Sequence, residues 1–173
     1  DRANLLPAGV LQPGDVLLGV ASNGPHTNGY SLLRKLFDWL PMDSTPPGFD
    51  EPLGTTLLKP HRNYLPVLDK VLQSGRVKAL AHITGGGLPE NLERLFQGLG
   101  ADLTIPAWGL PGIQKLYEHI DSEDRFHTLN MGIGWVAIVA PDDVEKACAA
   151  GAGGIVLGTM RQGDGVHVKV AGE

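Results

Sequence analysis

The segment best suited to chemistry spans residues 22–31, with the sequence SNGPHTNGYS. It follows a short apolar run and precedes apolar residues at helical spacing, which indicates a turn between a strand and a helix. Free backbone N–H groups at a helix start attract anions, and glycine lets a phosphate come close to the backbone. We therefore expect a phosphate or substrate site here, whose members are Ser22, Gly24, His26, Thr27, Asn28 and Gly29. The alternative, which the segment alone leaves open, is a turn in which Thr27 or Asn28 only caps the helix.

A second glycine-rich turn, at residues 84–87, repeats this arrangement. Three consecutive glycines follow an apolar strand pattern, and Pro89 then opens a helical pattern. Three glycines are more than a turn requires, which favours close approach of a ligand or of another part of the chain. This reasoning adds four residues to the candidate site: Thr84, Gly85, Gly86 and Gly87. The alternative is a tight, crowded corner.

A third turn has the sequence NMGIG at residues 130–134. Its glycines occupy alternate positions before an apolar strand pattern, which indicates a bulge or a flat face against which something packs. For this turn we favour the structural interpretation over a binding role.

Other catalytic patterns do not occur in the sequence, which contains neither a G-x-S-x-G elbow nor a Walker A lysine motif. The histidines lack H-x-H or H-x₃-H spacing, so we expect no metal site. They are His26, His61, His82, His119, His127 and His167. Only His26 is a candidate catalytic acid, because it lies inside the first turn. The single cysteine, Cys148, lies in a helical pattern and is interpreted as a bystander thiol.

The elements that must position these turns follow from hydrophobic periodicity. Strands are predicted at 16–20, 77–83, 102–105, 135–139, 155–159 and 166–170, and helices at 32–40, 59–73, 89–96, 111–119 and 141–150. Pro66 marks either a later start or a kink of the second helix. Residues 42–56 are rich in Pro, Gly, Asp and Thr and predict a surface loop. The mixed order predicts an α+β fold, an α/β/α layered sandwich with a mixed sheet and helices on both faces.

Composition narrows the classes of partner. The chain has 173 residues, with 14 Lys and Arg against 19 Asp and Glu, for a formal charge of −5. Its basic residues are scattered along the chain and form no basic stripe of the kind typical of a nucleic-acid binder, so we set that class aside. No apolar stretch approaches the length that crosses a bilayer, so we expect no membrane partner. The single cysteine fits a reducing compartment and predicts a cytoplasmic protein.

Taken together, the three turns resemble one family, the aminoimidazole ribonucleotide synthetases (phosphoribosylformylglycinamidine cyclo-ligases) of purine biosynthesis. The resemblance rests on GPHTNGYSL at 24–32 with RK at 34–35, AHITGGG at 81–87 with EN at 90–91, and NMGIG at 130–134. It runs from about residue 14 to about residue 170. A weaker match, LKPHRNY at 58–64, shares Pro60, Arg62 and Tyr64 with the family, and no role is carried onto His61.

The resemblance implies an ATP-dependent ring closure that converts formylglycinamidine ribonucleotide to aminoimidazole ribonucleotide. It further implies a homodimer of two-domain chains, in which the N-terminal domain supplies most of the residues that bind ATP and Mg²⁺. The present sequence, residues 1–173, then corresponds to the single C-terminal domain, with its own N-terminal domain as a partner. We expect no bound cofactor in this part alone, and no activity from it alone.

Three positions depart from the family pattern. The family usually has serine at positions 22, 23 and 27, where this chain has Ser22, Asn23 and Thr27. Asn23 and Thr27 each retain a hydrogen-bonding group. A cysteine is common in the family at Met131, so thiol chemistry is ruled out at that position.

Two other functions remain open at this point. The first is a relative in the same superfamily, such as formylglycinamidine ribonucleotide synthase, which shares the domain and its glycine turns. The second, from a non-enzymatic class, is a stand-alone module for phosphometabolite binding or dimerisation.

Overall fold

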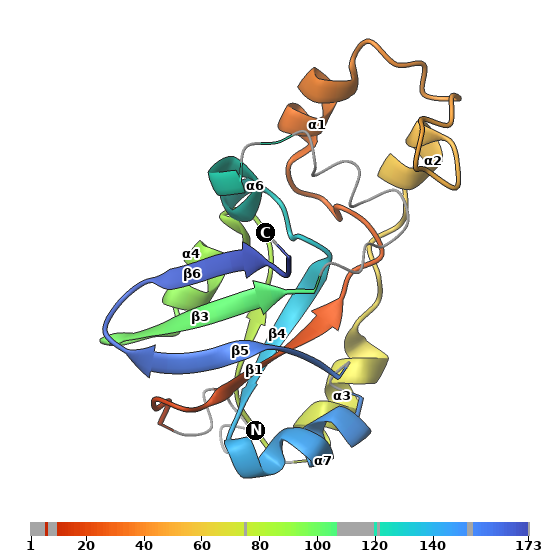
Figure 1. Ribbon diagram of the computed structural model, residues 1–173. Coiled ribbons are helices and arrows are strands. Elements are labelled where there is room, and N and C mark those ends of the chain that lie inside the picture. The colour runs from red at the N-terminus through yellow and green to blue at the C-terminus, as the bar shows by residue number, and fades with distance from the viewer. Residues whose placement is uncertain are drawn as a thin grey trace.

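A mixed six-stranded sheet forms the centre of the computed structural model, which describes residues 6, 10–74, 76–106, 120, 122–151 and 154–172 (Figure 1). The strand order is β2-β4-β1-β5-β3-β6. All neighbours are antiparallel except β3 and β6, which are parallel. The strands are β1 (Val16–Ala21), β2 (Val77–His82), β3 (Leu99–Ile105), β4 (Ile133–Val139), β5 (Ile155–Gln162) and β6 (Val166–Val170).

Helices cover both faces of this sheet, and two further helices, the first two in the chain, lie beyond the ends of its strands (Figure 1). The helices are α1 (Tyr30–Phe37), α2 (Leu53–Leu57), α3 (Leu65–Gln73), α4 (Gly87–Glu93), α6 (Ser122–Thr128) and α7 (Val144–Ala149), the last preceded by a 3₁₀ turn at Pro141–Asp143. Successive strand residues point to opposite faces, so Leu17 belongs to a buried cluster that includes residues of α4 and α6, while Leu18 belongs to a second cluster with residues of α3 and α7. The predicted layered α+β sandwich with a mixed sheet is confirmed.

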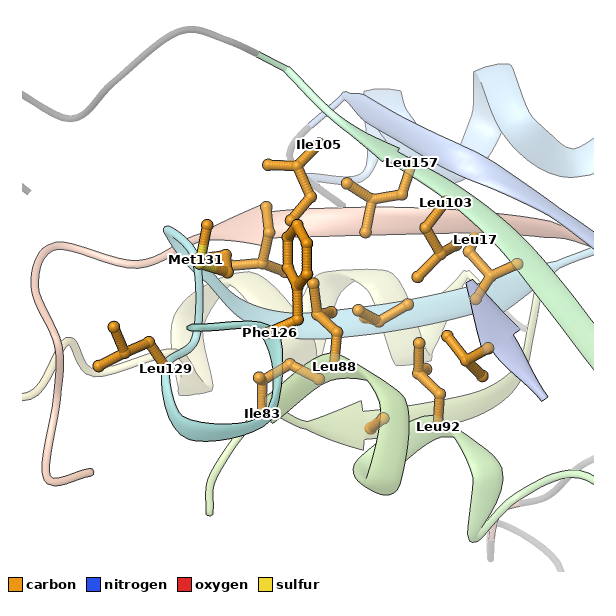
Figure 2. Close-up of a cluster of buried hydrophobic side chains, with 14 of the residues drawn as sticks. Leu17, Ile83, Leu88, Leu92, Leu103, Ile105, Phe126, Leu129, Met131 and Leu157 are labelled. Atoms are coloured by element: carbon orange, nitrogen blue, oxygen red, sulfur yellow. The ribbon is translucent and has the colours of Figure 1, made fainter. Parts of the chain in front are cut away.

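The largest of the three buried clusters lies between the sheet and helices α4 and α6. Figure 2 shows Phe126 of α6 among the labelled side chains, close to Leu88 of α4 and to Ile105 of β3. Leu17, Leu88 and Leu92 are fully buried. This packing holds the ends of β1, β2 and β4 in fixed relation, and the three glycine-rich turns follow or precede those ends.

The predicted strands at 16–20, 77–83 and 135–139 are confirmed as buried strands of one sheet. The second predicted helix begins later than Lys59, because Pro66 occupies the first turn of α3. The prediction of a surface loop at 42–56 is wrong in its last part, where α2 begins at Leu53 and buries Leu53 and Thr56. The helix predicted at 111–119 lies outside the described residues.

The last two strands follow each other in sequence but do not pair. β3 lies between β5 and β6, so the turn at 163–165 must cross its end. The guanidinium of Arg161 closes this turn by donating hydrogen bonds to the carbonyl oxygens of residues 162–165, at 3.1–3.3 Å. Within the described part of the chain, no helix is long and apolar enough to span a membrane.

Candidate functional site

The loop after β1 is held in place by the side chain of Asn130. Its amide nitrogen donates to the carbonyl of Gly24 at 2.8 Å, and its oxygen accepts from the backbone N–H of Gly132 at 2.9 Å. The hydroxyl of Ser22 also points to this oxygen, at 3.4 Å. Ser22 is 2% exposed, so its side chain positions the loop from below and does not face solvent. Residues 22–24 and 130–132 therefore form one structural unit.

Helix α1 begins without a side-chain cap. Gly29 is its N-cap residue, in the left-handed conformation with φ 78°, and no side chain makes a capping hydrogen bond. Thr27 and Asn28 therefore do not cap the helix, which was the structural alternative for this turn. A side chain at position 29 is excluded in any case, because a Cβ atom there would lie 2.4 Å from a methyl group of Leu129. The first-turn N–H groups of α1 thus remain available to an anion.

The glycine loop between β2 and α4 lies beside this helix start. A Cβ atom on Gly85 would lie 3.7 Å from the side-chain oxygen of Asn28, so the two predicted turns are neighbours. Gly86 and Gly87 have positive φ angles, and a Cβ on Gly87 would lie 1.8 Å from the carbonyl oxygen of Phe126. The crowded-corner interpretation therefore explains Gly86 and Gly87, and Gly85 presents the exposed surface of the loop.

Asn91 fixes the shape of this loop in the way that Asn130 fixes the first one. It is 7% exposed, and its amide nitrogen donates to the carbonyls of Gly85 at 3.1 Å and of Gly87 at 2.7 Å. Its oxygen accepts from the hydroxyl of Thr84 at 3.1 Å. Thr84 is consequently engaged within the loop. Both asparagines occur in the sequence motifs, but their role appears only when the loops are seen in space.

Four rings gather beneath the first loop, from segments far apart in the sequence. His26, with φ 59°, stacks on His61 with ring centroids 3.9 Å apart. His82 approaches His61 edge-on at 5.4 Å. The hydroxyl of Tyr64 lies 3.1 Å from Nε2 of His26. Gly134 makes room for this hydroxyl, because a Cβ at position 134 would lie 1.9 Å from it. Close packing at Gly134 therefore supports the flat face, one of the two structural interpretations of residues 130–134.

Burial disfavours the charged forms of three of these side chains, those of His26, His82 and Tyr64. It lowers the pKa of His26 to about 4, assisted by His61, His82 and Arg62. Burial likewise lowers the pKa of His82 and raises that of Tyr64 to about 12. A neutral imidazole can accept a proton or hydrogen bond but is a poor acid at pH 7. This pKa therefore disfavours the acid role that the sequence allowed for His26.

The low pKa of His26 predicts acid sensitivity of the folded state. Between pH 6.5 and about 4 the unfolded chain binds a proton at His26 that the folded chain does not. Protonation of His26 therefore leaves the free energy of unfolding unchanged above pH 6.5. As the pH falls toward 4, it lowers this free energy by up to about 3 kcal/mol. Urea unfolding across this range should show that the stability advantage of wild type over His26→Gln shrinks by this amount. A pH-independent difference between the two proteins would contradict the assignment.

A pocket opens between the first loop and the connection from α2 to α3. Its volume is about 410 Å³, and its polar lining includes His26, Thr27, Tyr30, Lys59 and His61. The ammonium of Lys59 forms an ion pair with Glu51 at 2.5 Å. Tyr30 donates a hydrogen bond to the carbonyl of Leu57 and so ties α1 to α2. Lys59 and Tyr30 were not among the predicted site residues; the signal for Lys59 was its place in the weak 58–64 match.

The uncapped start of α1 thus has Gly85 beside Asn28 and Lys59 in the adjoining pocket. Residues 12–171 match the family model described as AIR synthase related protein, C-terminal domain. The chain belongs to this family. The match covers every strand that the structure describes and all three glycine-rich turns.

Curated relatives of the chain carry the name phosphoribosylformylglycinamidine cyclo-ligase. The protein of Desulfitobacterium hafniense (strain DSM 10664 / DCB-2) is 39% identical over 96% of the chain and 52% of its own length. That of Caldicellulosiruptor saccharolyticus is 41% identical, over 90% of the chain and 49% of its length. That of Myxococcus xanthus is 42% identical, over 85% of the chain and 45% of its own length. The chain therefore spans about half the length of the curated relatives that it matches.

Solved structures share the fold of the chain at low sequence identity. HypE of Escherichia coli aligns over 94% of the chain and 48% of its own, with a TM-score of 0.58 and 22% identity. Thiamine-monophosphate kinase of Stenotrophomonas maltophilia aligns over 97% of the chain and 54% of its own length, with a TM-score of 0.59 and 19% identity. At such identities the likeness shows the fold alone.

Proposed function

We propose that this chain is the C-terminal half of an ATP-dependent cyclo-ligase that converts formylglycinamidine ribonucleotide to aminoimidazole ribonucleotide in de novo purine biosynthesis. The observation that carries the proposal is the match of up to 96% of the chain to relatives named cyclo-ligase, at 39–42% identity. The geometry supports it, because a ribonucleotide presents a phosphate of the kind that an uncapped helix start binds.

The ribonucleotide phosphate would bind at the start of α1. Thr27 is exposed and Asn28 half-buried, and both carry hydrogen-bonding groups beside the uncapped N–H groups. Gly85 lies opposite Asn28, where its lack of a side chain leaves room for the ligand. Lys59 adds a positive charge at the neighbouring pocket. In this proposal Gly24, Gly86 and Gly87 shape the loops, while Thr27, Asn28, Gly29 and Gly85 contact the substrate.

ATP and Mg²⁺ are assigned to an N-terminal domain, with which this domain would form a two-domain chain and a cytoplasmic homodimer. Mg²⁺ prefers oxygen ligands, carboxylates above all. Among the described residues the pocket offers mainly histidine, threonine and lysine groups, and nearby Glu51 is already paired with Lys59. The residues described here therefore do not fit a Mg²⁺ site, and we derive no step through that ion on this chain.

The division between two domains predicts that the isolated chain releases no ADP from ATP and formylglycinamidine ribonucleotide. Supplying the N-terminal half in trans should restore ADP release, because that half would bring the ATP-binding residues. Circular dichroism of the isolated chain verifies that it is folded in the assay. Full activity without the N-terminal half would contradict the division. Ribonucleotide binding with no activity in either mixture would support the stand-alone binding module instead.

A further inference from the structure

Three histidines from separate segments bring ring nitrogens to one point. His26 follows β1, His61 lies between α2 and α3, and His82 ends β2. One ring nitrogen from each lies within 4.8 Å of the other two. Spacing along the sequence could not reveal this cluster, because the nearest pair is 21 positions apart.

We propose that His26, His61 and His82 form a site for a divalent transition-metal ion of the zinc class. Three imidazoles with an open fourth position are a familiar ligand set for such ions. Imidazole nitrogen suits zinc, copper and nickel better than Mg²⁺ or Ca²⁺, which prefer oxygen. The proposal differs from the expectation drawn from sequence spacing and does not depend on the cyclo-ligase activity.

Two ring nitrogens in the cluster are buried and lack hydrogen-bond partners among the described residues. They are Nδ1 of His26 and Nε2 of His82. A buried polar atom without a partner is costly, and a metal ion would satisfy both atoms at once. We assign these two atoms as ligands, with a ring nitrogen of His61 as the third.

Tyr64 orients the first ligand. Its hydroxyl donates to the carbonyl of Ala21 at 3.3 Å and lies 3.1 Å from Nε2 of His26. In the proposed site Tyr64 directs its only proton at Ala21, and its phenol oxygen accepts from Nε2–H of His26. The lone pair of His26 is then on Nδ1, the atom assigned to the metal. Metal-binding histidines commonly have their second nitrogen fixed by such a hydrogen bond.

His61 completes the site by a local rotation. Zinc–nitrogen bonds of 2.0–2.1 Å place two ligands of a tetrahedral ion about 3.3 Å apart. The nitrogens, which lie within 4.8 Å of one another, must therefore close by at most about 1.5 Å. The His61 ring must also turn from its stacked position, so that its edge faces the metal. His61 is exposed and lies outside helices and strands, which makes this rotation inexpensive. The 410 Å³ pocket, lined by His26 and His61, leaves room for a water or an anionic oxygen as fourth ligand.

Titration of the full-length protein with Zn²⁺, followed by calorimetry, tests the proposal. We expect one saturable site whose affinity falls by at least about 100-fold in His61→Ala and in His82→Ala, and by about 10- to 100-fold in Tyr64→Phe. Co²⁺ at the same site should give the visible absorption of a tetrahedral nitrogen-ligated ion. His61 is exposed, so its substitution tests the site even if a His82 variant fails to fold.

Matched controls separate this site from other binding. His167→Ala removes an exposed histidine that lies beside Asp102 on the far strands and should leave Zn²⁺ affinity unchanged. Asn28→Ala should also leave it unchanged, so the metal site and the phosphate site can fail independently. Zn²⁺ affinity that is the same in wild type, His61→Ala and His82→Ala would overturn the proposal, as would the absence of saturable binding to wild type.

Discussion

Replacing Gly87 with alanine should destabilise the domain by roughly 3–5 kcal/mol. Two costs add at this position. The backbone has φ 59°, a left-handed conformation that costs alanine about 1–2 kcal/mol. The new Cβ would also lie 1.8 Å from the carbonyl oxygen of Phe126, so α4 and α6 must separate. Urea unfolding of the two proteins measures the difference.

Gly98 provides the matched control for this substitution. Its φ is 66°, and a Cβ there meets nothing within 4 Å. Gly98→Ala should therefore cost only the conformational penalty of about 1–2 kcal/mol. Equal losses for both variants would mean that the contact between Gly87 and Phe126 does not constrain the fold.

Replacing Asn28 with alanine in the full-length enzyme should weaken binding of the ribonucleotide substrate by about 10- to 100-fold. A hydrogen bond to a charged phosphate contributes about 1.5–3 kcal/mol, and 1.4 kcal/mol corresponds to a factor of ten. Stability should change by less than about 0.5 kcal/mol, because Asn28 does not cap α1. Substrate titration and thermal unfolding of the same variant give the two quantities.

Asn63 offers the opposite behaviour as a control. Its side-chain oxygen accepts a hydrogen bond from the backbone N–H of Leu65 at 3.0 Å, at the start of α3. Asn63→Ala should therefore cost about 1 kcal/mol of stability and leave substrate affinity unchanged. If Asn28→Ala instead lost stability and kept its affinity, the phosphate site at α1 would be wrong.

Strands β1 and β4 were predictable because their apolar runs are nearly continuous and have glycine or proline close to both ends. Helix α2 was not, since the prolines and glycines around it obscure the buried side chains of Phe49 and Leu53. Helix α6 has the polar sequence SEDRFHT, in which Phe126 is the one large apolar residue. A single apolar residue shows no helical periodicity, so the sequence did not predict this helix.

The candidate site was predictable one turn at a time. Each turn has a local signature in glycine and hydrogen-bonding side chains, but its neighbours depend on strand order. The pairing of β4 with both β1 and β2 places residues 130–134 between the other two turns. The histidine cluster depends in addition on the irregular segment at His61, whose path no local pattern specifies.

The parallel pairing of β6 with β3 has a practical consequence for handling the protein. β6 covers one edge of β3, whose sequence LGADLTI is largely apolar. A chain shortened to end at Gln162 would retain five strands but leave the backbone groups of β3 open along that edge. Open edges of this kind recruit strands from other molecules and lead to aggregation. In the intact domain the outermost strand carries His167 and Lys169, and a charged lysine discourages further strand addition. Tags and fusion partners therefore belong beyond Val170.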